Sequence, residues 1–171
     1  DGYQNEYLHV GNAYDLFGAL IDFDIWHLRW YMYTGYWPWG FYAVPWLFLY
    51  LFGISYTSLL YTNLLYVGII GISCFLLRHR TPAGLFFALI LATPSIFGTI
   101  VRYEPNLANI AWVSLGCAAL LRSENLRQRN WVLLWGISLG CGLMTDRLSV
   151  LFFLIPAIIP LIFPIVKERI W

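Results

Sequence analysis

Charged residues are scarce in this chain. Asp, Glu, Lys and Arg together make up 11% of its 171 residues, whereas 60% are hydrophobic and 19% are aromatic. A soluble globular protein has roughly 25% charged residues, which keep its surface solvated. Fewer than half as many charges cannot cover a water-facing surface, so the composition excludes an ordinary soluble domain. It predicts a protein whose main solvent is the lipid bilayer.

Cysteine is also rare and is not arranged for metal binding or redox chemistry. Cys74, Cys117 and Cys141 lie inside apolar stretches and form neither a CxxC pair nor a Cys/His ligand spacing. We therefore interpret them as small packing residues. The formal net charge is only +1, which gives no electrostatic basis for binding nucleic acid.

Five long apolar runs follow a more polar N-terminal stretch. They cover residues 55–77, 83–101, 105–121, 131–145 and 148–166. A helix needs about 20 apolar residues to cross the hydrocarbon, and about 17 can suffice. The fourth run is shorter and would form a hairpin with the fifth through Asp146–Arg147. Lipid offers the backbone no hydrogen-bond partner, so we predict an all-α membrane protein, a polytopic helical bundle with about five transmembrane helices.

We expect residues 1–54 to form an outer loop with interfacial helices, and residues 55–171 to form the transmembrane bundle. Within the loop, residues 37–53 are apolar but contain Pro38, Pro45 and many Trp and Tyr residues. Aromatic rings with a polar tip favour the headgroup layer. We therefore interpret this segment as an interfacial or partly inserted helix rather than a full span.

The two ends of the sequence suggest a fragment. The sequence opens at Asp1 and does not begin with Met or with a basic segment followed by an apolar one, and it ends at Trp171 shortly after an apolar run. A secretory signal would show that pattern. We expect residues 55–171 to be a fragment of a longer membrane domain, with a further span before Asp1.

The basic residues alternate between the predicted connections. Alternate connections hold Arg78, Arg80, Arg122, Arg127, Arg129, Lys167 and Arg169. The positive-inside rule makes these connections cytoplasmic and places residues 1–54 on the extracytoplasmic side of the cell or inner membrane. The outer acids are then Asp1, Glu6, Asp15, Asp22, Asp24, Glu104 and Asp146. Acids contribute little to orientation, so their gathering suggests a site, although loops also need charges for solvation.

Four segments carry a resemblance to a known family. They read DGYQNEYLHVGNAYDL (1–16), WPWGFYAVPWLFLYLFGIS (37–55), TPSIFGTIVRYEPN (93–106) and GISLGCGLMTDRLSVLFFLIPAII (136–159). In order and spacing they resemble the polytopic GT-C glycosyltransferases, particularly relatives of dolichyl-phosphate-mannose protein mannosyltransferases and of bacterial lipid A aminoarabinose transferases. The resemblance implies an inverting transfer of sugar from a polyprenyl-phosphate donor. Two features depart from the family pattern: Asn5 stands beside Glu6 in place of an acidic pair, and Asp146–Arg147 replaces a Lys.

Such a transfer needs a carboxylate to take the acceptor's proton and cations to neutralise the leaving phosphate. Asp1 and Glu6 are the candidate catalytic bases, although on one helix they would lie about 140° apart. The resemblance favours Asp1. Arg102 and Arg147 are the candidate donor phosphate ligands, because a guanidinium matches phosphate geometry. Alternatively, each arginine extends to the lipid headgroups.

Three further residues are predicted to support the site: Glu104, His9 and Asp146. Glu104 would orient Arg102, or hold a divalent metal together with Asp1, since carboxylate oxygens suit Mg²⁺ or Mn²⁺. His9 and His27 are equally compatible with a place at the membrane interface. Asp22 and Asp24 form a lone DxD pattern that we interpret as solvated acids. The nearby aromatics either stack on sugar faces or anchor the interface: Tyr31, Tyr33, Tyr36, Trp37 and Trp39.

The sequence therefore predicts a membrane glycosyltransferase that uses a polyprenyl-phosphate-linked sugar donor among the membrane lipids. Two other classes remain. A transporter or lipid flippase would carry polar residues at mid-span and broken helices in paired segments, whereas here the spans hold little besides Asn63, Asn109, Ser and Thr. A non-catalytic membrane subunit would explain the spans but not the gathered acids and arginines.

Overall fold

The computed structural model describes residues 2–34, 40–77, 93–124, 126–147 and 151. The regular elements of these residues are all helices, which confirms the all-α prediction for this part of the chain. Their bounds are α1 (Gly2–Ile21), α2 (Ile25–Thr34), α3 (Gly40–Ala43), α4 (Pro45–Phe52), α5 (Tyr56–Leu76), α7 (Pro94–Ile100), α8 (Pro105–Arg122) and α9 (Arg129–Thr145).

The helix α5 has the length and composition of a membrane span. It contains 21 residues, which at about 1.5 Å per residue reach about 32 Å, close to the thickness of the hydrocarbon. Of the described residues, only this helix meets both criteria. The predicted runs 83–101 and 148–166 lie largely outside the described residues. By length and composition, the described residues thus contain one candidate membrane span, whereas the sequence predicted about five.

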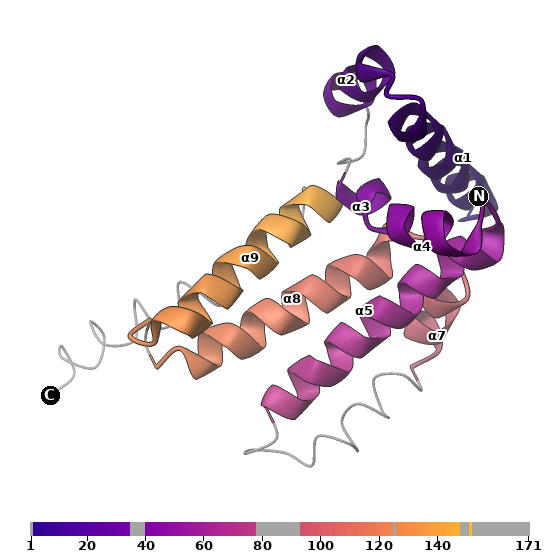
Figure 1. Cartoon of the computed structure of the whole chain (residues 1–171). Coiled ribbons are helices and arrows are strands. Elements are labelled where there is room, and N and C mark those ends of the chain that lie inside the picture. The colour runs from indigo at the N-terminus through magenta and orange to yellow at the C-terminus, as the bar shows by residue number, and fades with distance from the viewer. Residues whose placement is uncertain (1, 35–39, 78–92, 125, 148–150, 152–171) are drawn as a thin grey trace, which may run out of the picture.

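Three helices, α5, α8 and α9, lie side by side as a bundle (Figure 1). α5 and α8 run in the same direction and α9 returns. Small side chains allow close packing: Ala108, Ala111 and Ala118 of α8 are buried, and the Ser114 hydroxyl donates to the Ser73 hydroxyl at 3.3 Å. At one end of the bundle, α5 and α8 begin and α9 ends; we call this the Glu104 end. We call the opposite end the Arg122 end.

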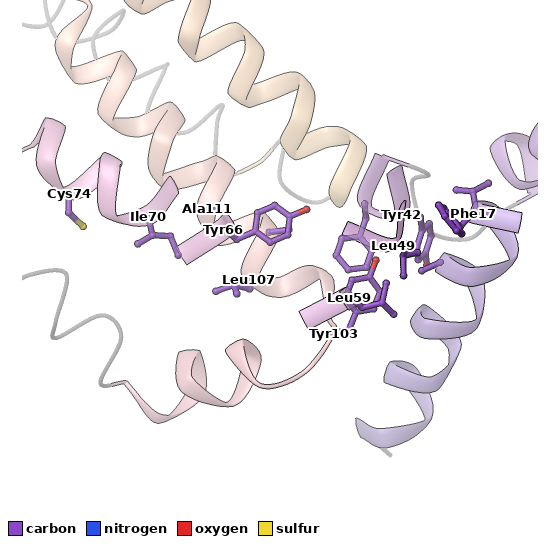
Figure 2. Close-up of a cluster of buried hydrophobic side chains, with 14 residues drawn as sticks. Phe17, Tyr42, Leu49, Leu59, Tyr66, Ile70, Cys74, Tyr103, Leu107 and Ala111 are labelled. Carbon is purple, nitrogen blue, oxygen red and sulfur yellow. The ribbon is translucent and has the colours of Figure 1, made fainter. Parts of the chain in front are cut away.

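The N-terminal helices gather at the Glu104 end (Figure 1). There α4 packs against α5, α3 packs against α9, and α1 packs against both α3 and α4, while α2 continues from the far end of α1. Figure 2 shows the buried apolar cluster that joins them, which includes Phe17, Phe41, Tyr42, Leu49, Leu59, Tyr103 and Leu107. Burial of these apolar and aromatic side chains holds the helices together where α5 begins.

The predicted single helix over 37–53 is two helices in the described part, α3 and α4. Pro45 begins α4 at its first helical position, where the missing N–H of proline is tolerated, whereas inside a continuous helix it would break the chain of hydrogen bonds. Gly53 then ends α4 with φ 82°, a backbone conformation that favours glycine. Ser55 starts α5, and its Oγ accepts a hydrogen bond from the Ser58 N–H at 3.2 Å.

Arg122 ties α8 to the last turn of α5 at the Arg122 end. Its Nε and Nη2 both donate to the Leu76 carbonyl oxygen, at 2.8 and 2.6 Å. Carbonyls in the last turn of a helix have no partner within the helix, so the guanidinium satisfies one of them. The same guanidinium lies 5.7 Å from the centre of the Trp131 ring on α9, within the range of a cation–π contact. One side chain thus connects all three bundle helices.

We predict that Arg122→Ala lowers the stability of the bundle by about 1–3 kcal/mol, because it leaves the Leu76 carbonyl without its charged donor. Thermal unfolding in detergent would show this as a lower melting temperature. Arg127, which is exposed, provides the matched control, and Arg127→Ala should leave the melting temperature nearly unchanged. Equal melting temperatures for the two variants would contradict the proposed role of Arg122.

Candidate functional site

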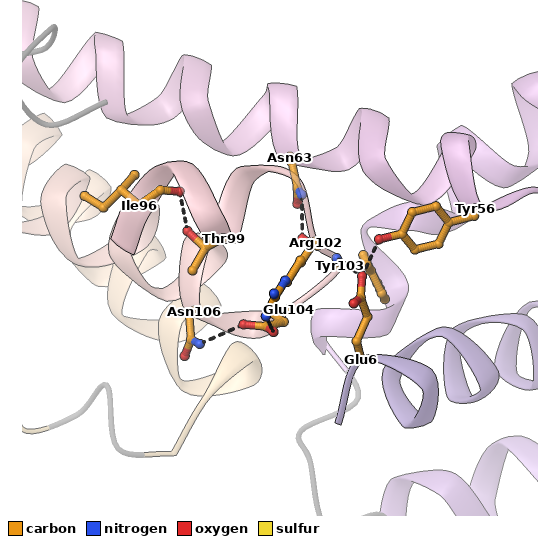
Figure 3. Close-up of polar contacts among 9 residues, drawn as sticks. All are labelled: Glu6, Tyr56, Asn63, Ile96, Thr99, Arg102, Tyr103, Glu104 and Asn106. Atoms are coloured by element: carbon orange, nitrogen blue, oxygen red, sulfur yellow. Dashed lines mark hydrogen bonds and ion pairs between the residues drawn. The ribbon is translucent and has the colours of Figure 1, made fainter. Parts of the chain in front are cut away.

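The connection between α7 and α8 carries two of the predicted site residues, Arg102 and Glu104. It is held against α5 by Asn63, whose Nδ2 donates to the carbonyl oxygens of Ile100 and Arg102, both at 2.8 Å. Figure 3 shows the hydrogen bond to Arg102. Asn63 is 2% exposed. The amide of Asn63 therefore binds the carbonyl of the last residue of α7 and that of Arg102 in the connection, which have no partner within a helix.

Glu104 lies beside Arg102 and just before the first residue of α8. Its Oε1 is 4.0 Å from Arg102 Nη1, and its Oε2 accepts a hydrogen bond from Asn106 Nδ2 at 3.2 Å. The side chain of Arg102 is 39% exposed, so this ion pair is weakened by water. The guanidinium thus stays accessible while Glu104 orients it.

Glu6 joins this group from α1. Its Oε1 accepts hydrogen bonds from the backbone N–H of Tyr103, at 3.3 Å, and from the Tyr56 hydroxyl (Figure 3). Residues 97 positions apart in the sequence are thereby brought together. The structure thus brings Glu6 to the short segment that contains Arg102 and Glu104, at the Glu104 end. All three were predicted site residues.

Asp146 and Arg147 lie at the same end of the bundle, directly after α9. The backbone N–H of Asp146 makes the last helical hydrogen bond, to the Gly142 carbonyl at 2.9 Å, and its extended backbone ends the helix. Its Oδ2 accepts a hydrogen bond from Asn109 Nδ2 of α8 at 3.4 Å. Arg147 is exposed. The helix pairing therefore brings the second predicted arginine to the end that holds the first, whereas Asp1 lies outside the described residues.

His9, which was predicted as a supporting site residue, is buried where α1 packs against α3. It is 2% exposed. Its Nδ1 is 2.9 Å from the Tyr42 hydroxyl, which also accepts a hydrogen bond from Asn12 Nδ2 at 3.3 Å. The ring meets Phe41 edge to face at 5.7 Å. Burial lowers the pKa of His9 to about 4, so near neutral pH it is an uncharged contact that packs α1 against α3.

The acids Asp22 and Asp24 lie at the turn between α1 and α2. Asp24 Oδ1 accepts hydrogen bonds from the backbone N–H groups of Trp26 and His27, both at 3.1 Å. These N–H groups lie in the first turn of α2 and have no partner within the helix. Asp24 Oδ2 is 2.7 Å from His27 Nδ1, and this side-chain hydrogen bond is the main cause of the lowered pKa of Asp24. A cavity of about 470 Å³ lies beside these residues and is also lined by Tyr14 and Asp15.

Metal binding was predicted for Asp1 together with Glu104. Within the described part of the chain, no group of three or more His, Cys, Asp and Glu side chains is placed to hold a metal ion. Because Asp1 lies outside that part, the proposed pair stays a prediction. Glu104 itself has Arg102 and Asn106 as its neighbours.

Reasoning from the sequence missed two residues that organise the site. Asn63 was noted only as a polar residue within an apolar run, yet it positions the 100–102 segment. Tyr103 is fully buried and stacks on Phe41 with ring centres 4.9 Å apart. Burial raises the pKa of its phenol well above the usual value, and the neighbouring phenols of Tyr66, Tyr42 and Tyr14 raise it further. An isolated polar residue in an apolar run is the signal that could have identified Asn63.

Comparison of the chain with protein-family models, with curated proteins and with solved structures gives no match. The geometry of the Glu104 end is therefore the basis for the chemistry considered below. It offers carboxylates from α1 and from the α7–α8 connection, together with an accessible guanidinium.

We predict that the stability of the protein falls as the pH drops from 6.5 towards 4, partly through His9. The folded-state pKa of about 4 lies below the ordinary value of 6.5, so the unfolded chain binds a proton first. The contribution of neutral His9 is present above pH 6.5 and is lost as the pH falls through this window. Between pH 7 and 4.5 it amounts to about 2 kcal/mol.

The variant His9→Gln isolates this term, because glutamine is polar but does not titrate. Denaturant unfolding of both proteins at pH 7 and at pH 4.5 would measure it. The variant should lose less stability on acidification than the wild-type protein does. Identical losses would show that His9 has the same protonation behaviour in the folded and unfolded chains.

Proposed function

We propose that this chain is part of a polytopic membrane glycosyltransferase that takes sugar from a polyprenyl-phosphate donor at the extracytoplasmic face. The observation that carries the proposal is the convergence of Glu6, Arg102 and Glu104 from separate segments at one end of the bundle. The resemblance of the four sequence segments to GT-C enzymes supports the reaction class. Fold resemblance alone would not assign the chemistry, which depends on the site.

The placement of charge along the bundle supports the membrane arrangement. Arg122 lies at one end beside Leu76, and Arg102 and Glu104 lie at the other end. α8 has 18 residues and α9 has 17, so at about 1.5 Å per residue both approach the hydrocarbon thickness. With α5, they would form three of the proposed spans, with α1 to α4 at the extracytoplasmic surface.

The proposed reaction is a single displacement. The acceptor hydroxyl oxygen attacks the anomeric carbon as the bond from that carbon to the phosphate oxygen breaks, and the polyprenyl phosphate leaves with the electron pair. A carboxylate takes the hydroxyl proton. Asp1 remains the first proposed base and Glu6 the second. Arg102 and Arg147 would bind the phosphate as its charge develops.

We predict that Asp1→Asn in the full-length protein abolishes sugar transfer without preventing membrane insertion, since loss of a general base typically reduces a rate about 10²- to 10⁴-fold. Transfer from polyprenyl-phosphate sugars in proteoliposomes would measure it. Glu6→Gln tests the second candidate in the same assay. Retained transfer in Asp1→Asn with loss in Glu6→Gln would move the base to Glu6, and retained transfer in both would contradict both proposed bases.

Arg102→Ala should weaken apparent donor affinity about 10-fold or more, because charge-assisted hydrogen bonds to phosphate are lost. Arg127→Ala, at the Arg122 end, is the matched control and should keep the wild-type affinity. An unchanged donor affinity in Arg102→Ala would make Arg102 a headgroup contact. Movement of the lipid-linked sugar across the membrane without transfer would favour a flippase.

The proposed orientation can be tested by labelling single cysteines. In a protein without Cys74, Cys117 and Cys141, Tyr7→Cys and Arg127→Cys would place one exposed thiol near each end of the bundle. A membrane-impermeant maleimide should label Tyr7→Cys in intact cells and Arg127→Cys only after permeabilisation. Labelling of both from the same side of an intact membrane would contradict the proposed arrangement and the site built on it.

A further inference from the structure

Four side-chain oxygens in the half of the bundle nearest the Glu104 end are buried without a hydrogen-bond partner among the described residues. They are Thr62 Oγ1, Tyr66 OH, Tyr103 OH and Asn109 Oδ1. Buried polar groups in proteins are nearly always paired, and an unpaired one destabilises the fold. For stability alone, phenylalanine would serve better than Tyr66 or Tyr103, so these hydroxyls need another explanation.

These groups lie in one region of the interior. Tyr66 and Thr62 are one turn apart on α5, and the Tyr66 ring meets Trp112 of α8 at 6.3 Å. Figure 2 shows the Tyr66 hydroxyl directed along the bundle toward the end where Tyr103 and Tyr42 lie. Tyr66, Thr62 and Tyr103 are each 0% exposed. The phenols of Tyr66 on α5 and Tyr103 in the α7–α8 connection thus lie in the same water-excluded part of the interior, and Thr62 is buried one turn before Tyr66.

The short helix α3 covers this region. Phe41 stacks on the Tyr103 ring at 4.9 Å, and Gly40 lies so close to α9 that an added Cβ would be 2.8 Å from the Met144 carbonyl oxygen. α3 has four residues, and its side-chain packing and the contact between Gly40 and α9 hold it in place. Movement of this one turn away from Met144 would open a path to the buried hydroxyls with little loss of helical hydrogen bonding.

The chemistry of the region suits a sugar ring. Phenol and threonine hydroxyls both donate and accept, and an amide oxygen accepts, so together they match the alternating donors and acceptors of sugar hydroxyls. Phe41 covers one face of the Tyr103 ring, and movement of α3 would free that face for the C–H side of the sugar ring. Tyr103 also directly follows Arg102, which places these groups next to the proposed phosphate ligand.

We propose that Tyr66, Tyr103, Thr62 and Asn109 form the binding subsite for the sugar ring of the lipid-linked donor, opened by movement of α3. This inference rests on the proposed function and adds to it the groups that recognise the sugar. The phosphate would stay at Arg102, and the sugar would be enclosed beneath α3, where exclusion of water protects the donor from hydrolysis.

Lipids with and without a sugar distinguish this subsite from the phosphate site. The full-length protein in nanodiscs would be titrated with bare polyprenyl phosphate and with a panel of the same lipid bearing a hexose or an aminopentose. The wild-type protein should bind at least one sugar-bearing lipid more tightly than the bare lipid. Tyr66→Phe and Tyr103→Phe should each reduce that preference about 3- to 10-fold, the effect of one lost hydrogen bond, and leave affinity for the bare lipid unchanged.

Tyr50→Phe is the matched control, because Tyr50 is 76% exposed and should change neither affinity. Without lipid, Tyr66→Phe and Tyr103→Phe should melt at the wild-type temperature or above it, since each removes an unpaired buried hydroxyl. A lower melting temperature in either variant, or an undiminished sugar preference, would overturn the subsite. Failure of the wild-type protein to bind any of these lipids would overturn the proposed function and the subsite with it.

Discussion

The arrangement of the Glu104 end depends on one buried amide. Asn63 on α5 donates to the carbonyl oxygens of Ile100 and Arg102, which lie at the end of α7 and in the connection that follows it, where no helical partner is available. In an apolar surrounding, such groups must be satisfied by protein. Because both hydrogens of one amide do this, the connection is held against α5, and the residues that follow it occupy defined positions.

Glu6 and Glu104 take their places from that connection. The Tyr103 backbone N–H binds Glu6 and so docks the start of α1, while Glu104 borders the first turn of α8 beside Arg102. Beneath this charged rim lie the buried phenols and the aromatic stack of Phe41 on Tyr103. In this dry interior, hydrogen bonds and charge interactions are stronger than they are in water, because the local dielectric is lower.

The two ends of the bundle use charge differently. At the Arg122 end, a guanidinium serves the fold, because it binds the Leu76 carbonyl and lies against Trp131. At the Glu104 end, Arg102 keeps 39% of its side chain exposed beside Glu104. The same residue type is therefore a structural contact in one place and an accessible cation in the other, and the partners around it make the difference.

Much of the helical layout could be predicted. The apolar run 55–77 corresponds to α5, and the runs 105–121 and 131–145 correspond closely to α8 and α9, because prolines and charged residues interrupt an otherwise apolar sequence there. The segment 37–53 was predicted less well, since its length suggested one helix and the break at Pro45 makes two. The burial of His9 could not be predicted either, because it results from the packing of α1 on α3.

Composition and the periodic return of apolar runs by themselves predicted helices that suit lipid, because few charges cannot solvate a surface and lipid does not satisfy a bare backbone. The described residues confirm the helices, and α5 is long and apolar enough to cross a membrane. The sequence also determined which residues carry charge. Tertiary structure alone decided which of these residues meet. Contacts such as Glu6 with Tyr103, or Asn63 with Arg102, join segments 97 and 39 residues apart, and such pairings depend on how helices pack rather than on any local pattern.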